Sequence, residues 1–446
     1  MDAFFGSIWW LIVSLGILVT FHEFGHYWVA RRCGVHVLRF SVGFGKPLWQ
    51  RRGKDGTVWQ VAMIPLGGYV KMLDERETPV QPEDRHLAFN NKTVWQRIAI
   101  VAAGPGFNLV LCLALLWAMF LVGKPDYAPV VGEARGVAAE AGFEYGDRLV
   151  SVGSRPVDTW SGALTALMVA AMDREPVEVR VRTEEGTDRT RVMDFSDAER
   201  ITDRNAIGQI GLVPMPFMLE PVVGGVDSEG SPLVPGDRIV SVNQHRIRTW
   251  GDISPAVAAE AGADAPLAVV VERDGLRLPL QVQPRRVETD GQARWVIGIS
   301  ARPATAEFDA VLRHGPVAGV GAAARETWQL TGDILGMMWR MVNGTASLQN
   351  LSGPITIAQY ANSSAGLGLA WFLNFLALLS LSLAIINLLP IPILDGGHLL
   401  YYFIELIKGS PVSEKTMIVG QYVGLAMLAG LMGLAFYNDF LRLFGG

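Results

Sequence analysis

Four long apolar stretches constrain the fold of this 446-residue chain more than any other feature. They run from about Gly6 to Ala30, Ile98 to Val122, Leu369 to Leu400 and Thr416 to Tyr437. Each is long enough to cross about 30 Å of hydrocarbon as a helix. Half of the residues are hydrophobic and 18% are charged, which is too apolar for an average soluble protein. The sequence predicts a polytopic α-helical membrane protein with four spans in a lipid bilayer.

The first apolar stretch is expected to be a retained span and not a cleavable signal. Asp2 is the only charged residue before it, so the basic start of a signal peptide is missing, and no small-residue cleavage site follows. The net charge of −5 carries no basic footprint, so no nucleic-acid partner is expected. Cys33 and Cys112 fit ordinary small apolar residues, and their spacing indicates neither a disulfide framework nor a metal site.

Basic residues in the loops predict the orientation in the membrane. Lys408 and Lys415 lie between the third and fourth spans, and the loop between the first two is rich in Lys and Arg: Arg31, Arg32, Arg39, Lys46, Arg51, Arg52, Lys54, Lys71, Arg76, Arg85, Lys92 and Arg97. The positive-inside rule places both loops in the cytoplasm. Both termini and the segment from about Gly123 to Leu369 are then expected outside.

One further stretch, from Val317 to Val342, is fairly apolar but is interrupted by charges at Arg325, Glu326, Asp333 and Arg340. An interfacial helix is expected there in preference to a fifth span.

The segment between the second and third spans contains a tandem repeat. Residues 146–160, GDRLVSVGSRPVDTW, align with residues 236–250, GDRIVSVNQHRIRTW, and eight of the fifteen positions are identical. A Gly-Asp turn followed by alternating apolar residues is typical of β-strands. We therefore expect two small β-rich domains, at 126–218 and 219–304, and a helical linker at 305–368. Residues 1–125 and 369–446 would form the two parts of the membrane core.

Each repeat resembles the PDZ domains of bacterial envelope proteases in its GD-R-[IL]-V-x-V run. Such domains capture a peptide by adding it as a strand to an exposed sheet edge. The expected role is recognition of a peptide or protein ligand, and the alternative is a spacer or steric gate. Gly153 in the first copy stands where the second has Asn243, and neither copy shows a long Gly-rich loop.

The first span carries the motif His22-Glu23-Phe24-Gly25-His26. Two histidines four residues apart lie on one helix face, where both imidazoles can reach one zinc ion. Glu23 lies beside them and can take a proton from a water molecule at the metal. Ionisable side chains at membrane depth cost about 2.5–3.5 kcal/mol each, so they indicate function. The alternative is a helix end at the interface with snorkelling polar residues.

A catalytic zinc ion needs a third protein ligand, and Asp395 in Asn387-Leu-Leu-Pro-Ile-Pro-Ile-Leu-Asp-Gly-Gly397 is the candidate. Pro390 and Pro392 break the third span, and irregular backbone at this depth is tolerated only around a buried or hydrated cavity. With four spans, the first and third run in the same direction. The histidines and Asp395 then lie at matching depth, which supports an interfacial 317–342.

These motifs together resemble the site-2 protease family of intramembrane metalloproteases. FHEFGHYWVARRCGV, IPLGGYVKMLDE, NLLPIPILDGGHLL and Gly104-Pro-Gly-Phe-Asn108 carry the resemblance, which extends along nearly the whole chain. It implies one Zn²⁺ held by His22, His26 and Asp395, with Glu23 activating water. It also implies that Asn387 positions the substrate or stabilises the oxyanion, and we place Pro390 and Pro392 in the substrate-binding region. His398 is expected to lie near the site without being a ligand.

The resemblance also implies a membrane-associated β-hairpin at about Arg39–Met72. Its stretch containing Gly67, Gly68 and Tyr69 would pair with the unwound substrate, since an edge strand offers replacement hydrogen bonds while a helix unwinds. The alternative is a basic cytoplasmic loop with two ordinary strands.

The activity that follows is endoproteolysis of single-span membrane proteins in a bacterial inner membrane. By resemblance, the substrate is an anti-sigma factor already shortened outside by another protease, in envelope stress signalling, with the two repeats excluding intact substrates by size. Remnant signal peptides are a second substrate class. Two rival functions remain: a membrane-anchored zinc protease that cleaves soluble proteins, and a non-enzymatic PDZ scaffold.

Overall fold

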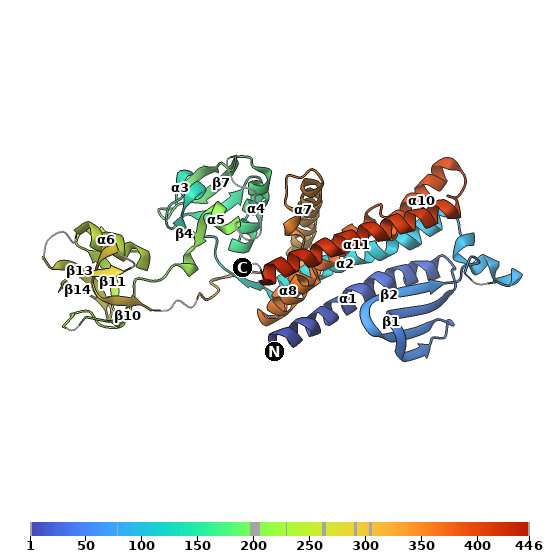
Figure 1. Ribbon diagram of the computed structural model, residues 1–446, viewed down its shortest axis with the longest axis horizontal. Coiled ribbons are helices and arrows are strands. Elements are labelled where there is room, and N and C mark those ends of the chain that lie inside the picture. Colours follow the sequence, from blue (N-terminus) through green and yellow to red (C-terminus); the bar gives the residue numbers. More distant parts are fainter. Residues whose placement is uncertain are drawn as a thin grey trace. The chain divides into compact units, whose positions relative to one another are not determined.

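The computed structural model describes residues 2–77, 79–196, 206–228, 230–260, 265–289, 292–302 and 306–444 (Figure 1). The chain divides into two compact units. The first combines Met1–Pro125 with Leu312–Gly446, and the second is Asp126–Val311. The first unit contains all the apolar spans, so residues far apart in the sequence form one helical body.

Four helices of the first unit are long and apolar enough to cross a membrane, as predicted. They are α1 (Asp2–Arg32), α2 (Val94–Val122), α9 (Leu369–Leu388) and α11 (Glu414–Phe444). α2 begins with a capping box, in which the Thr93 side chain accepts from the Gln96 backbone and the Gln96 side chain accepts from that of Thr93. α1 and α2 run side by side (Figure 1), and Gly25 allows their close approach: a Cβ there would lie 2.4 Å from the Ala103 carbonyl oxygen.

α7 (Pro316–Val342) is a single helix over the stretch expected at the interface. Within the described residues it is not among the helices apolar enough to span a membrane. It runs across α2 in Figure 1, with Ala322 and Ala323 buried in the core that α2 and α9 share. Trp328 and Trp339 are exposed, 80% and 66% respectively. Exposed tryptophans beside a buried small-residue stripe are typical of an interfacial helix.

The third span is broken where the prolines predict. α9 ends at Leu388, and a new helix, α10 (Asp395–Lys408), begins at Asp395. Gly396 and Gly397 let this turn close, because a Cβ on Gly396 would lie 2.2 Å from the Leu389 carbonyl oxygen. The break therefore places Asp395 at the first position of a helix.

The fourth span carries two buried polar residues, Asn438 and Asp439, near its end. Asp439 near the end of α11 is buried and accepts the backbone N–H groups of Gly353 and Ile355 at 3.1 and 2.8 Å. These groups belong to the start of α8 (Pro354–Gly366), whose first N–H groups have no partner within the helix. Asn438 donates to the Leu348 carbonyl at 2.8 Å. The C-terminal end of α11 is thus fastened to α8 by buried polar groups.

The predicted hairpin is present as β1 (Val37–Arg52) and β2 (Val58–Met72). The two long strands pair along their length and bend, so that residues 39–42 lie between 68–71 on one side and 58–61 on the other. In the pairing of the described residues, 68–71 have a neighbour on one side only. This stretch of β2 is therefore an edge strand, and it packs against α1.

The second unit contains two four-stranded sheets with the same strand order, β6-β5-β7-β8 and β12-β11-β13-β14. The first consists of β5 (Arg148–Val152), β6 (Arg155–Pro156), β7 (Val177–Arg182) and β8 (Asp188–Met193), with helix α4 (Trp160–Asp173). The second consists of β11 (Arg238–Val242), β12 (His245–Arg246), β13 (Leu267–Arg273) and β14 (Leu276–Val282), with helix α6 (Ile253–Glu260). The domain boundaries and the assignment of these sheets to PDZ domains stay predictions.

Shorter elements complete the chain. The helices are α3 (Gly136–Glu140) and α5 (Ala206–Ile210), and the strands are β3 (Lys124–Asp126), β4 (Val131–Ala134), β9 (Leu212–Pro214), β10 (Val223–Val226), β15 (Arg285–Thr289), β16 (Gln292–Val296), β17 (Ile299–Ala301) and β18 (Ala310–Leu312).

The repeated Gly-Asp pair has a structural explanation. Asp147 and Asp237 are buried, and each accepts a backbone N–H from three residues earlier, at 3.1 and 2.9 Å. Each also accepts from an arginine of the same sheet, Arg191 on β8 at 3.2 Å and Arg273 on β13 at 2.7 Å. The aspartate therefore closes the turn and ties it to the sheet in both copies.

We expect Asp237→Asn to lower the free energy of unfolding of the second sheet by about 1–3 kcal/mol. The substitution replaces the carboxylate that pairs with Arg273 by a neutral amide, so the guanidinium loses its charged partner. Burial alone would raise the pKa of Asp237, but the hydrogen bonds from Arg273 and Val234 hold it below the usual range. A lowered folded-state pKa contributes stability above about pH 4 that is lost as the pH falls through that pKa. Hydrogen exchange of β11 and β13 in the full chain should differ more between this variant and the wild type at pH 7 than at pH 3. Asp227→Asn, on an exposed residue, is the control; equal exchange in both variants would contradict the prediction.

Candidate metal centre

α1 brings the two histidines of the motif together on one face. His22 and His26 are one helical turn apart, and their Nε2 atoms lie 3.3 Å from each other. Glu23 lines the same cavity. The i, i+4 spacing therefore places both imidazoles as predicted from the sequence.

Asp395 reaches this pair from the start of α10. Its Oδ2 atom lies 3.2 Å from His22 Nε2 and 3.5 Å from His26 Nε2. The oxygen is buried, and the described residues offer it no hydrogen bond. Within the described part of the chain, His22, His26 and Asp395 form the one group of three or more potential ligands whose donor atoms lie close enough to share an ion.

The donor set fits zinc in chemistry and spacing. Catalytic zinc sites use three nitrogen or oxygen ligands at about 2.0–2.1 Å and leave the fourth tetrahedral position open. Two ligands of such a tetrahedron are separated by about 3.3 Å. The three separations here, 3.3, 3.2 and 3.5 Å, match that value.

α2 orients both imidazoles. The Nδ1 atom of His26 lies 2.9 Å from the Ile100 carbonyl oxygen and donates to it. This donation fixes the tautomer in which Nε2 carries a free electron pair for a metal. Gly104 lies directly against the rings, since a Cβ there would be 2.3 Å from His26 Nε2.

Asn108 performs the same task for His22. Its side-chain amide lies 3.2 Å from His22 Nδ1, while its Oδ1 atom is buried without a hydrogen bond from the described residues. The two ends of an amide group are assigned from the hydrogen-bond network. Turning the amide over places Oδ1 against Nδ1–H, which satisfies the buried oxygen and frees His22 Nε2 for the metal.

We expect Asn108→Leu to weaken zinc binding by about 10–100-fold, the usual effect of losing a group that orients a metal ligand. The measurement is competition for zinc with a chelator of known affinity. Ser380→Ala is the control, because Ser380 Oγ donates to the Asn108 backbone oxygen at 2.7 Å and does not touch the histidines. Unchanged zinc affinity in Asn108→Leu would show that Asn108 does not orient His22 for the metal.

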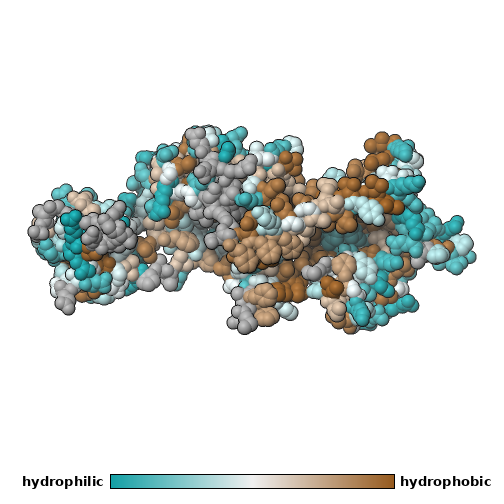
Figure 2. Space-filling view, in the orientation of Figure 1, coloured by the Kyte–Doolittle hydropathy of each residue, from teal (hydrophilic) through white to brown (hydrophobic). Residues whose placement is uncertain are grey.

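The centre opens into a cavity of about 730 Å³. One wall is the edge strand of β2, from Gly68 to Met72, and another is formed by α10 residues including His398 and Tyr402. In Figure 2 the helices present a largely brown, apolar surface and the hairpin a mixed one, whereas the end of the molecule at the loop after the hairpin is largely teal. The cavity therefore joins an apolar helical body to a polar rim.

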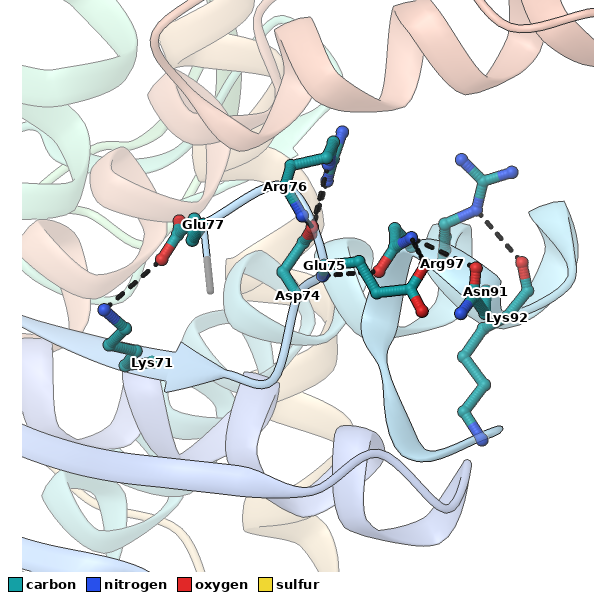
Figure 3. Close-up of polar contacts among 9 residues, drawn as sticks. Lys71, Asp74, Glu75, Arg76, Glu77, Asn91, Lys92 and Arg97 are labelled. Atoms are coloured by element: carbon teal, nitrogen blue, oxygen red, sulfur yellow. Dashed lines mark hydrogen bonds and ion pairs between the residues drawn. The ribbon is translucent and has the colours of Figure 1, made fainter. Parts of the chain in front are cut away.

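Ion pairs hold the loop between β2 and α2 at this rim (Figure 3). Lys71 Nζ lies 3.4 Å from Glu77, and Arg76 Nε donates to Asp74 at 2.9 Å. Burial alone would raise the pKa of Asp74, but the Arg76 hydrogen bonds hold it below its usual range. These charges line the polar end of the cavity that contains the three ligands.

A buried ion pair connects the same end of α2 to α10. Arg97 Nη2 donates to Glu405 at 2.7 Å, and both side chains are largely buried. The guanidinium of Arg97 also lies 4.9 Å from the centre of the Tyr402 ring. The helix that carries Asp395 is thus held against the helix that orients the histidines.

The predicted substrate-binding residues are only partly brought to the cavity. Gly68 and Tyr69 line it. Among the described lining residues, Gly67, Asn387, Pro390 and Pro392 do not appear. A Cβ on Gly67 would lie 2.3 Å from the Phe44 ring, and Pro392 packs against Gly420 and Gly424 of α11. The roles assigned to all of these residues stay predictions.

The site contains two histidines and one aspartate at the spacing of zinc ligands, and a glutamate lies beside them in an apolar helix. Comparison with known protein families agrees with this chemistry. The model of peptidase family M50 matches residues 10–431. The chain belongs to this family. It is a zinc metalloprotease of the site-2 type, as its motifs indicated.

The similarity covers nearly the whole chain in several bacterial relatives. A protein of Xylella fastidiosa (strain 9a5c) described as a zinc metalloprotease is 50% identical over 99% of this chain and 100% of its own length. The regulator of sigma-E protease RseP of Escherichia coli (strain K12) is 43% identical over 97% of this chain and 98% of its own. That of Salmonella typhimurium (strain 14028s / SGSC 2262) is 41% identical over 98% of this chain and 100% of its own.

Proposed function

We propose that this zinc metalloprotease cleaves single-span membrane proteins within or near their transmembrane segment. The observation that carries the proposal is the convergence of His22, His26 and Asp395 from two helices of the apolar unit, next to an edge strand. A protease for soluble substrates has no need to place its ligands in such helices, where ionisable groups are costly.

The residues of the chain divide the chemistry among them. Zinc, when bound, supplies a Lewis acid that polarises the scissile carbonyl and makes water a stronger nucleophile. Glu23 is placed to take the proton from the attacking water and to return it to the leaving amide nitrogen. Ile100 and Asn108 keep the imidazoles in the ligating tautomer throughout.

The edge strand of β2 could hold the substrate so that its scissile peptide bond reaches the metal centre. A helical peptide bond is shielded by its own hydrogen bonds, so the substrate must unwind before attack. Residues 68–71 pair with 39–42 on one side, and their other side borders the cavity. Gly68 lies against Glu23, since a Cβ there would be 3.1 Å from Glu23 Cγ. A substrate added to this edge would therefore pass beside the catalytic carboxylate.

The names of the relatives support a role in sigma-E regulation. The substrate would then be an anti-sigma factor already shortened by a first protease, with remnant signal peptides as a second class. The two repeated sheets would act as PDZ-like domains that bind a peptide or exclude intact substrates by size. The protein would lie in the bacterial inner membrane, with its termini and the second unit in the periplasm.

The test is cleavage of a tagged single-span membrane protein by the full chain in lipid vesicles, followed by mapping of the cut. We expect a cut inside or at the edge of the substrate's span, and none with Asp395→Asn. A cut confined to a soluble segment would favour a membrane-anchored protease for soluble proteins and contradict the proposal. Absence of any cut, with zinc bound and several single-span substrates tried, would favour the non-enzymatic scaffold.

A further inference from the structure

A second pocket, of about 580 Å³, lies between the end of α1 and the turn that joins β1 to β2. It is separate from the metal centre, because none of its lining residues also lines the catalytic cavity. Its lining combines aromatic and basic side chains with one carboxylate: Tyr27, Trp28, Arg31, Arg32, Gly53, Lys54, Asp55 and Trp59.

The one carboxylate of this pocket, Asp55, already has hydrogen-bond and ion-pair partners within the protein. Asp55 accepts from Tyr27 at 3.0 Å and from Thr57 Oγ1 at 2.8 Å, and Arg31 Nε lies 3.5 Å away. These contacts fasten the hairpin turn to α1 and neutralise the charge of Arg31.

The other two basic side chains of the pocket, Arg32 and Lys54, have no carboxylate partner among the described residues. Among the described residues no carboxylate lies within ion-pair distance of Arg32 or Lys54, and both side chains are exposed. The guanidinium of Arg32 instead lies 4.5 Å from the centre of the Trp28 ring. The pocket therefore presents two unbalanced cations over an aromatic surface, which suits an anion with an apolar part.

The depth of the pocket identifies the source of such an anion. The apolar span of α1 ends at Arg32, so Trp28 lies in its last turn. Tryptophan at the end of a span marks the headgroup level of a bilayer, and basic residues there meet lipid phosphates. Trp59 closes the other side of the pocket, with its ring 4.9 Å from Tyr27 and 4.7 Å from Phe40.

We propose that this pocket binds the headgroup of an anionic phospholipid from the leaflet at this end of α1. Arg32 and Lys54 contact the phosphate, and Trp28 lies along the glycerol and the first acyl carbons. Because Arg32 belongs to α1 and Lys54 to the hairpin turn, the bound lipid bridges the helix that carries His22 and His26 to the sheet that carries the edge strand.

The test counts lipids retained by the full chain in native mass spectrometry, with phosphatidylglycerol titrated against phosphatidylcholine. We expect one phosphatidylglycerol molecule to bind in preference, and Arg32→Gln with Lys54→Gln to weaken it by about thirtyfold, since each basic residue near a lipid surface contributes roughly a factor of five. The matched control is Arg51→Gln with Arg52→Gln, which removes the same charge from exposed residues at the end of β1 outside the pocket. Zinc content, unchanged in both pairs, reports that the variants are folded.

Three results would overturn the proposal. Equal weakening in the two double variants would show attraction by general surface charge. Displacement of the lipid by millimolar inorganic phosphate would show a site for free phosphate and not for a lipid. Equal retention of phosphatidylcholine would show that the pocket does not select an anionic headgroup.

Discussion

Glu23→Gln is expected to reduce peptide-bond cleavage by about 10²–10⁴-fold, the usual contribution of a positioned general base. Glutamine keeps the size and the hydrogen-bonding reach of the side chain but cannot accept a proton at neutral pH. Glu23 lies outside the ligand set, so zinc should stay bound. The measurement pairs a single-turnover cleavage assay with zinc analysis of the same sample.

Asp395→Asn is the matched comparison, because it removes one carboxylate charge from the same cavity. In the wild type, Asp395 Oδ2 is one of the three donor atoms that lie close enough to share a metal ion. The variant should therefore lose both bound zinc and cleavage activity. Loss of zinc from Glu23→Gln but not from Asp395→Asn would reverse the assignment of ligand and base. Unchanged cleavage in Glu23→Gln would falsify the proposed mechanism.

Gly104→Ala is expected to disable the metal centre although it adds only one methyl group. The new Cβ would lie 2.3 Å from His26 Nε2 and 2.8 Å from His22 Cε1, closer than non-bonded atoms can approach. The rings cannot simply turn aside, since His26 is held by the Ile100 carbonyl and His22 by Asn108. Zinc affinity should fall by more than the roughly 10–100-fold typical of losing an orienting group.

Gly106→Ala provides the control two residues along the same helix. A Cβ at Gly106 meets nothing within 4 Å, and alanine there favours the helix by up to about 1 kcal/mol. This variant should bind zinc and cleave like the wild type. If Gly104→Ala also bound zinc with unchanged affinity in a chelator competition, the close approach of α2 to the ligands would be wrong.

The apolar helices and the positions of the candidate ligands on them were predictable because both depend on local rules. A run of apolar residues must be helical in a membrane, and a helix places i and i+4 on one face. Pro390 and Pro392 end α9 because proline cannot donate a backbone hydrogen bond. The residue pattern alone was therefore enough to assign Asp395 to a break in a helix.

No orienting role was predicted for Ile100, Gly104 or Asn108, although Gly104 and Asn108 belong to a motif that carries the family resemblance. Asn108 is a polar residue within an apolar span, and that signal could have identified it. The Ile100 carbonyl has no sequence signature, because every residue carries one. Gly104 is one small residue among several in α2, and its role depends on which face of α2 meets α1.

The sequence by itself determined which segments are long and apolar enough to cross a membrane, that His22 and His26 share one helix face, and that a broken helix carries Asp395. Tertiary structure alone decided how the imidazoles are held and which stretch of the hairpin is left as an edge. The physical reason is that ligation follows from residue type and helical spacing. Orientation follows from the packing of α2 on α1 at Gly25, and the free edge follows from how β1 and β2 bend.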